Sequence, residues 1–140
     1  MNILKLTASS VAGNVNTDFT ADGDMEILYG HVVLTTDATV ANRTVEIVVI
    51  DDAGTPATFA DFHSGSVVTA SSSNYHHDIL PGIFRETSFL TTGASNIQLP
   101  VPRRFIIPSG YGLRVTVDNG VAGDSYNANF VAISLGKHSV

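Results

Sequence analysis

The stretch from residue 43 to 51 has the strongest β-pattern in the chain, with five valine or isoleucine residues in nine positions. Such branched side chains are stiff at χ1 and fit a pleated sheet, so this pattern predicts a strand. The face expected to point into the core holds Val45, Ile47 and Val49. The opposite face carries Val48 and Ile50 beside Glu46. A strand that is apolar on both faces belongs in the middle of a sheet, with its second face also covered.

Alternating apolar and polar residues, separated by turn-forming residues, predict about seven further strands. We expect them at residues 3–8, 25–36, 66–75, 83–90, 104–107, 113–118 and 125–135. Residues 57–62 fit either a short strand or one helical turn. Within 25–36, uninterrupted alternation would place Tyr29 on the same face as Ile27 and His31. Gly30 in the middle of that strand indicates a bulge or a close backbone approach.

No window of useful length shows apolar residues at the 3.6-residue spacing of a helix. The sequence therefore predicts an all-β protein, an antiparallel β-sandwich of about eight strands. Long strands that pair across the sequence favour a jelly-roll-like arrangement of two four-stranded sheets packed face to face. An immunoglobulin-like sandwich is the second choice, because the chain lacks the Trp and Cys that such domains usually carry.

Residues 9–24 are rich in Ser, Asn, Gly, Asp and Thr, and their apolar anchors are Val11, Val15 and Phe19. Long loops without secondary structure are uncommon in compact domains and are often functional. We therefore divide the chain into residues 1–24, a first strand followed by an extended arm or loop, and residues 25–140, the β-sandwich domain. The arm either docks onto a partner or is a surface loop.

The composition favours a protein that is packed against other proteins. Charged residues make up only 14% of the 140 residues, whereas ordinary globular domains have about 25%. The net charge of −6 argues against a nucleic-acid partner, because phosphate neutralisation needs clustered Lys and Arg. No window approaches the ~20 apolar residues of a membrane span, and the apolar run at the N-terminus is too short for a signal peptide. We expect the protein to be made in a cytoplasm, and we expect no membrane association.

Candidate chemistry is sparse. The absence of cysteine excludes disulfides and thiolate sites. His76 and His77 are adjacent, so on a strand they would point to opposite faces and could not both bind one ion. Neither a His-x-His pair nor a Gly-x-Ser-x-Gly nucleophile turn is present. We therefore expect no enzyme activity, no catalytic or metal-binding residues and no cofactor.

Carbohydrate binding is an alternative from another functional class. Sandwich proteins bind sugars through exposed aromatic side chains together with Asn or Asp, and Tyr75, Tyr111 and Tyr126 are the candidates here. The chain has no Trp and is only 8% aromatic, which favours structural burial of these tyrosines. Exposed tyrosines in a shallow groove would distinguish the sugar-binding alternative.

Three short features carry a resemblance to a known class of proteins. They are Asn42-Arg43-Thr44 at the entry to the central strand, Pro108-Ser109-Gly110-Tyr111 before Leu113-Arg114-Val115, and Asp124 before a long final strand. Over residues 25–135 the chain resembles small all-β structural proteins of tailed bacteriophages. Those proteins decorate or cement the capsid shell, or sit in the tail and neck.

The resemblance implies a structural virion protein, most like a capsid decoration or cement protein that binds and stabilises the outer surface of the phage head. Its partner would be the major capsid protein, it would form a homotrimer, and it would reach the virion after synthesis in the host cytoplasm. The alternatives are a tail or neck component and the carbohydrate-binding module. By this analogy, the expected contact residues are Val11, Val15, Phe19, Leu99, Val101, Arg103 and Arg104.

Overall fold

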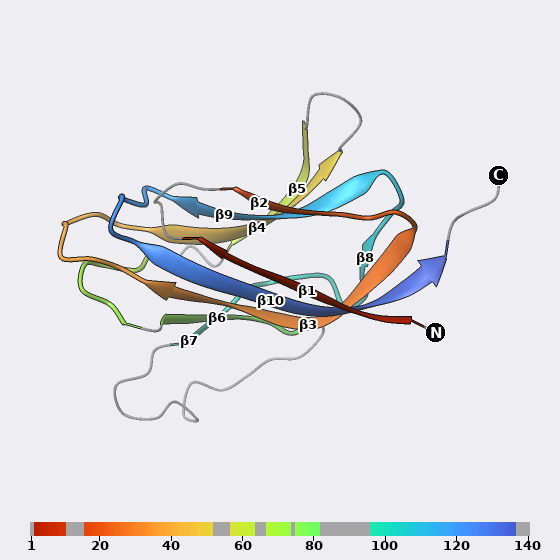
Figure 1. Cartoon of the computed structure of the whole chain (residues 1–140), viewed down its shortest axis with the longest axis horizontal. Coiled ribbons are helices and arrows are strands. Elements are labelled where there is room, and N and C mark those ends of the chain that lie inside the picture. Colours follow the sequence, from red (N-terminus) through yellow and green to blue (C-terminus); the bar gives the residue numbers. More distant parts are fainter. Residues whose placement is uncertain are drawn as a thin grey trace.

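The computed structural model describes residues 2–10, 16–51, 57–63, 67–73, 75–81 and 96–136. The regular secondary structure of these residues consists of β-strands, as the sequence predicts (Figure 1). In chain order the strands are β1 Asn2–Ser10, β2 Thr17–Thr20, β3 Asp24–Thr35, β4 Thr44–Asp51, β5 Ala57–Phe62, β6 Tyr75–Ile79, β7 Asn96–Gln98, β8 Phe105–Ile107, β9 Tyr111–Asp118 and β10 Ser125–Gly136.

The strands form two sheets stacked face to face (Figure 1). The larger sheet has the order β1-β10-β3-β6-β7, with β8 also paired to β3, and the smaller sheet has the order β2-β9-β4-β5. Pairing is antiparallel throughout the described ladders, except that β6 and β7 are parallel. The molecule is thus a β-sandwich with its core between the sheets.

The pairing pattern is nested, which makes the sandwich a jelly roll. The first strand pairs with the last, β1 with β10, and the next inward pair is β2 with β9. Further inward, β3 pairs with β6 and then β8 along one edge, and β4 pairs with β5. A long antiparallel hairpin rolled into two sheets has this order. The fold prediction is confirmed, although short strands β6, β7 and β8 fill the stretch between β5 and β9.

Strand β4 is an inner strand of the smaller sheet, as its sequence predicts. Its expected core face, Val45, Ile47 and Val49, belongs to the central apolar cluster. Val48 and Ile50 on the other face are also buried. A strand was expected at residues 66–75, but Val68 makes only an isolated bridge to Arg43 and the strand β6 begins at Tyr75. The predicted strand at 83–90 lies outside the described residues.

A bulge in β3 changes which side chains face outward. Val131 of β10 pairs with Tyr29 and Ala132 pairs with Ile27, so Leu28 is an extra residue in β3. The extra residue reverses the alternation, and Tyr29 lies on the outer face while Ile27 lies in the core. The expectation that these two residues share a face was therefore wrong.

Gly30 follows this bulge and lies directly opposite Phe130 of β10. A Cβ atom at Gly30 would come within 2.3 Å of Phe130 Cδ1 and 2.9 Å of the Asn129 carbonyl oxygen. Phe130 is buried in the core and packs edge to face on Phe19. The bulge and the close backbone approach expected at this glycine are both present, and the ring of Phe130 adds a side-chain contact that was not expected.

Gly30→Ala is expected to lower the free energy of unfolding by about 1–3 kcal/mol, because the new methyl group overpacks the core against a backbone oxygen that cannot move away. Chemical denaturation measures the loss. Gly112→Ala is the matched control, since its Cβ would come no closer than 3.2 Å to the Ile50 side chain and 3.4 Å to the Phe19 carbonyl oxygen. Equal losses in the two variants would contradict the role given to the ring of Phe130.

The N-terminal residues belong to the sandwich. All nine residues of β1 pair with β10, and all four of β2 pair with β9. The boundary proposed at residue 24 therefore does not separate an arm from the domain in the described residues. Residues 11–15, with Val11 and Val15, lie outside them. The short polar strand β2 was not expected, because its own sequence, Thr-Asp-Phe-Thr, has one apolar side chain.

A buried ion pair joins loops at one end of the sandwich. The Arg43 side chain is fully buried; its Nε donates to Asp124 Oδ2 at 2.9 Å and its Nη2 donates to Asp124 Oδ1 at 3.1 Å. It also donates to Asp37 Oδ1 at 3.1 Å and to the Ala41 carbonyl oxygen at 2.9 Å. Burial opposes ionisation of Asp124, but Arg43 and backbone N–H groups outweigh it and lower the pKa of this carboxyl.

Candidate binding surface

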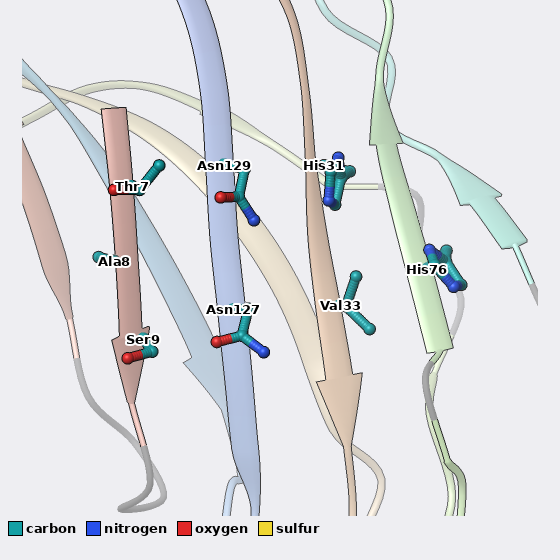
Figure 2. Close-up of a pocket in the computed structure, with 8 residues that line it drawn as sticks. All are labelled: Thr7, Ala8, Ser9, His31, Val33, His76, Asn127 and Asn129. Atoms are coloured by element: carbon teal, nitrogen blue, oxygen red, sulfur yellow. The ribbon is translucent and has the colours of Figure 1, made fainter. Parts of the chain in front are cut away.

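The outer face of the larger sheet carries a shallow polar groove of about 690 Å³ (Figure 2). Strand register sets its side chains in two rows across the sheet. One row runs from Thr7 through Asn129 to His31, on β1, β10 and β3. The other runs through Ser9, Asn127, Val33 and His76, on β1, β10, β3 and β6. We call this surface the polar groove.

The polar side chains of the groove have unused hydrogen-bonding capacity. They are Thr7, Ser9, His31, His76, Asn127 and Asn129. Within the described part of the chain, none of these six side chains forms a hydrogen bond. The residues that line the groove include no Asp, Glu, Lys or Arg. The groove therefore presents donors and acceptors without a formally charged acid or base.

The other half of the same face is mainly apolar, with the charged residues Lys5 and Glu26 among its positions. Ile3 pairs with Ile133, Ile133 pairs with Glu26, and Glu26 pairs with Ile106, so these residues form a row across four strands. Val131 pairs with Tyr29 in the next row, where the β3 bulge also exposes Leu28. We call this surface the apolar patch, and its residues are Ile3, Leu28, Tyr29, Ile106, Val131 and Ile133. Ile3 is 66% exposed and Tyr29 is 52% exposed.

The apolar residues expected to contact a partner lie mostly in the interior. Leu99 is 1% exposed, Phe19 is half-buried with its ring 5.8 Å from that of Phe130, and Val101 packs against the core. Their side chains anchor the segments that carry them, so in this conformation they offer little surface to a partner. That part of the contact prediction is corrected by the structure.

The two expected basic contacts remain at the surface. Arg103 is exposed. Arg104 is also exposed and donates to Glu26 from Nη2 at 3.0 Å, and its hydrogen bonds lower the pKa of Glu26. Because Glu26 lies in the row between Ile133 and Ile106, this ion pair borders the apolar patch. Sequence patterns missed the patch because the β3 bulge, which turns Leu28 and Tyr29 outward, depends on the register of β10.

The tyrosines considered for sugar binding are not gathered on an exposed surface. Tyr126 is 3% exposed and its hydroxyl bonds with Thr17 Oγ1. Tyr75 and Tyr111 are partly buried against the core. Tyr29, which was not among the candidates, is the exposed tyrosine, and it lies two residues before His31 on the face of the polar groove.

The histidines on β6 point to opposite sides, as adjacent strand residues should. His76 lies on the groove, where its ring centroid is 6.5 Å from that of His31 (Figure 2). His77 is buried in the interior beside Tyr75. Among the residues that the structure describes, no group of three His, Cys, Asp or Glu side chains could hold a metal ion.

The outer face of the smaller sheet is acidic. Arg114 of β9 pairs with Asp18 of β2 at 2.7 Å. Partial burial, together with the neighbouring carboxyls of Asp118 and Asp61, raises the pKa of Glu46 on β4 to about 7. Neighbouring carboxyls repel one another when they are ionised. This face is therefore a less suitable binding surface for a neutral or apolar partner than the larger sheet.

Comparison with protein-family models, curated proteins and solved structures finds no match to this chain. In the described ranges, no helix is long and apolar enough to cross a membrane.

Proposed function

We propose that this chain is a structural, non-enzymatic protein of a tailed-bacteriophage particle, of the kind that decorates or cements the outer surface of the capsid. The apolar patch is the observation that carries the proposal. Its side chains lie on adjacent strands of one sheet, so they form a rigid surface, in which Glu26 stands between Ile133 and Ile106. Contiguous exposed apolar surface in a protein commonly marks a site of interaction with another protein.

The patch agrees with the composition of the chain. A protein with only 14% charged residues has little with which to solvate a large free surface. Burying the patch against a neighbour removes apolar area from water, which contributes roughly 25 cal/mol for each Å². The partner proposed is the major capsid protein, and a homotrimer would bridge several of its copies. Each later contact of such a trimer then forms at high effective concentration.

The location is tested on particles from the phage that carries the gene, by immunogold electron microscopy with an antibody against this chain. Label on the head surface is the expected result. Label on the tail or neck would favour the alternative of a tail or neck component. Absence of the chain from purified particles, measured by mass spectrometry, would contradict a role in the virion.

The role of the patch is tested by the double variant Ile3→Asp/Ile106→Asp. Both side chains are exposed, so the variant should fold, but its charges would be desolvated in an interface and incorporation into particles should fall at least about tenfold. Incorporation is measured by quantitative mass spectrometry of particles made with each variant. Val40→Asp is the control, because Val40 is 92% exposed in a loop outside the patch. Normal incorporation of the double variant would rule out the patch as the contact surface.

A further inference from the structure

We propose that the polar groove is a binding site for a neutral oligosaccharide, a function additional to the structural role proposed above. The groove is formed by four adjacent strands of the larger sheet (Figure 2), and Tyr29 of the apolar patch adjoins it on the same outer face, two residues before His31 on β3. Its volume of about 690 Å³ lies within the range of roughly 300–1,000 Å³ that is usual for small-molecule sites.

The chemistry of the lining selects the ligand class. An Asn side chain both donates and accepts hydrogen bonds, and so does a hydroxyl group. Asn127, Asn129, Thr7 and Ser9 supply these groups from two neighbouring strands, and His31 and His76 add ring nitrogens from two more. A sugar carries several hydroxyls that each donate and accept, so it can use all of these groups at once. Under an apolar ligand, the same side chains would lose their hydrogen bonds to water and gain no others.

The charge of the groove argues against ionic ligands. No Lys or Arg lines it to pair with a phosphate, sulfate or carboxylate, and no Asp or Glu lines it to pair with a cation. The protein as a whole has a net charge of −6, which disfavours polyanions further. A neutral oligosaccharide rich in hydroxyl groups needs neither a basic nor an acidic partner in the groove.

Tyr29 supplies an aromatic surface at one end of the groove. It lies on the same outer face as His31, two residues away on β3, and its side chain is 52% exposed. An aromatic ring with one apolar face and a polar hydroxyl suits the mixed surface of a sugar ring. The β3 bulge is what turns this ring outward, so the aromatic end and the hydrogen-bonding rows come from one feature of the strand.

The groove requires little reorganisation to bind. Its side chains project from strands β1, β10, β3 and β6, which are joined by continuous backbone ladders. The spacing between neighbouring strands, roughly 4.8 Å, fixes the distance between hydrogen-bonding groups across the sheet. Groups that are already ordered lose less entropy on binding than groups on a loop.

The test uses the full-length protein and a printed array of neutral hexasaccharides of glucose, mannose, galactose, xylose and N-acetylglucosamine. Binding to at least one is expected, with the affinity then measured by isothermal titration calorimetry. The double variant Asn127→Ala/Asn129→Ala should bind the same hexasaccharide at least about tenfold more weakly, because it lacks several hydrogen bonds. Tyr29→Ala should weaken binding as well.

Asn42→Ala is the matched control, since Asn42 is exposed and lies away from the groove. It should bind like the unmodified protein. Thermal unfolding of all variants should be nearly unchanged, because the side chains of Asn127 and Asn129 form no hydrogen bond with a described residue. The proposal is overturned if no hexasaccharide binds at millimolar concentration, or if binding persists unweakened in the Asn127→Ala/Asn129→Ala variant.

Discussion

Arg43→Met is expected to lower the free energy of unfolding by about 3–5 kcal/mol, the loss that follows when one partner of a buried ion pair is removed. Arg43 is fully buried, and both of its bonds to Asp124 are formed away from water. Without the guanidinium group, Asp124 keeps a buried charge that is balanced only by the N–H groups of Asp37 and Val121. Asp37 loses its partner at the same time.

Urea denaturation measures this loss, with Arg114→Met as the control. Arg114 also pairs with an aspartate, but that pair is partly exposed, so its removal should cost about 1 kcal/mol or less. Adding Asp124→Asn to Arg43→Met should cost less than the sum of the two single substitutions, because the second removes the charge that the first leaves unpaired. Strict additivity, or similar losses at Arg43 and Arg114, would show that the buried pair is not a coupled unit.

Acidification from pH 7 to pH 4 is expected to destabilise the protein by about 3 kcal/mol through His77 alone. Burial lowers the pKa of His77 to about 4, although the nearby backbone of Val32 and Tyr75 and the charge of Asp78 favour the protonated form. Neither ring nitrogen forms a hydrogen bond of normal geometry with a described residue. The neutral ring therefore fits the core, and the charged ring does not.

The direction follows from the two pKa values. The unfolded chain has the ordinary histidine pKa of 6.5, so between pH 6.5 and about 4 it takes up a proton that the folded protein does not. Stability falls over this window as the pH decreases and the loss levels off below pH 4; a drop from 6.5 to about 4 corresponds to about 3 kcal/mol.

His77→Leu should remove this contribution. The free energy of unfolding, measured by urea denaturation at pH 7, 5.5 and 4, should decline less steeply in the variant than in the unmodified protein. His76→Leu is the control, since His76 lies next in the chain but on the outer face, and it should retain the steep decline. Parallel declines in the His77→Leu variant and the unmodified protein would show that His77 titrates normally in the fold.

Features that depend on local sequence were predictable. The apolar character of both faces of β4 indicated an inner strand, and a glycine in the middle of β3 indicated a bulge or a close backbone approach, both of which are present. The all-β class and the jelly-roll arrangement followed from strand lengths and the lack of helical periodicity. The first two of these signals each lie within one stretch of about ten residues, and the last two come from the strand pattern of the whole chain.

Features that depend on pairing with distant parts of the same chain were not predictable. Leu28 is an extra residue only relative to the register of β10, so nothing in the alternation of β3 itself announces that Tyr29 turns outward. Strand β2 forms because its backbone pairs with that of β9; its four mostly polar residues do not by themselves favour a strand. Arg43 and Asp124 were noticed as separate features, but their pairing across 81 positions needed the fold.

The candidate surfaces show the same limit. The polar groove combines residues from β1, β3, β6 and β10, and in the sequence they look like ordinary solvent-facing positions of four unrelated strands. Their convergence requires the strand order and register of the larger sheet. The contact prediction placed weight on apolar residues in segments that looked irregular, yet Leu99 and Val101 are apolar because they pack inward.

The nested pairing of the strands has a consequence for synthesis of the protein in a cell. The partner of Asn2 in the sheet is Ser134, which is synthesised 132 residues later. At about 5–20 residues per second, β1 would wait on the order of ten seconds for β10 to be made. The larger sheet can therefore close only after β10 has been made, and until then Leu4 and Leu6 are open to chaperones or to the same strand of another nascent chain.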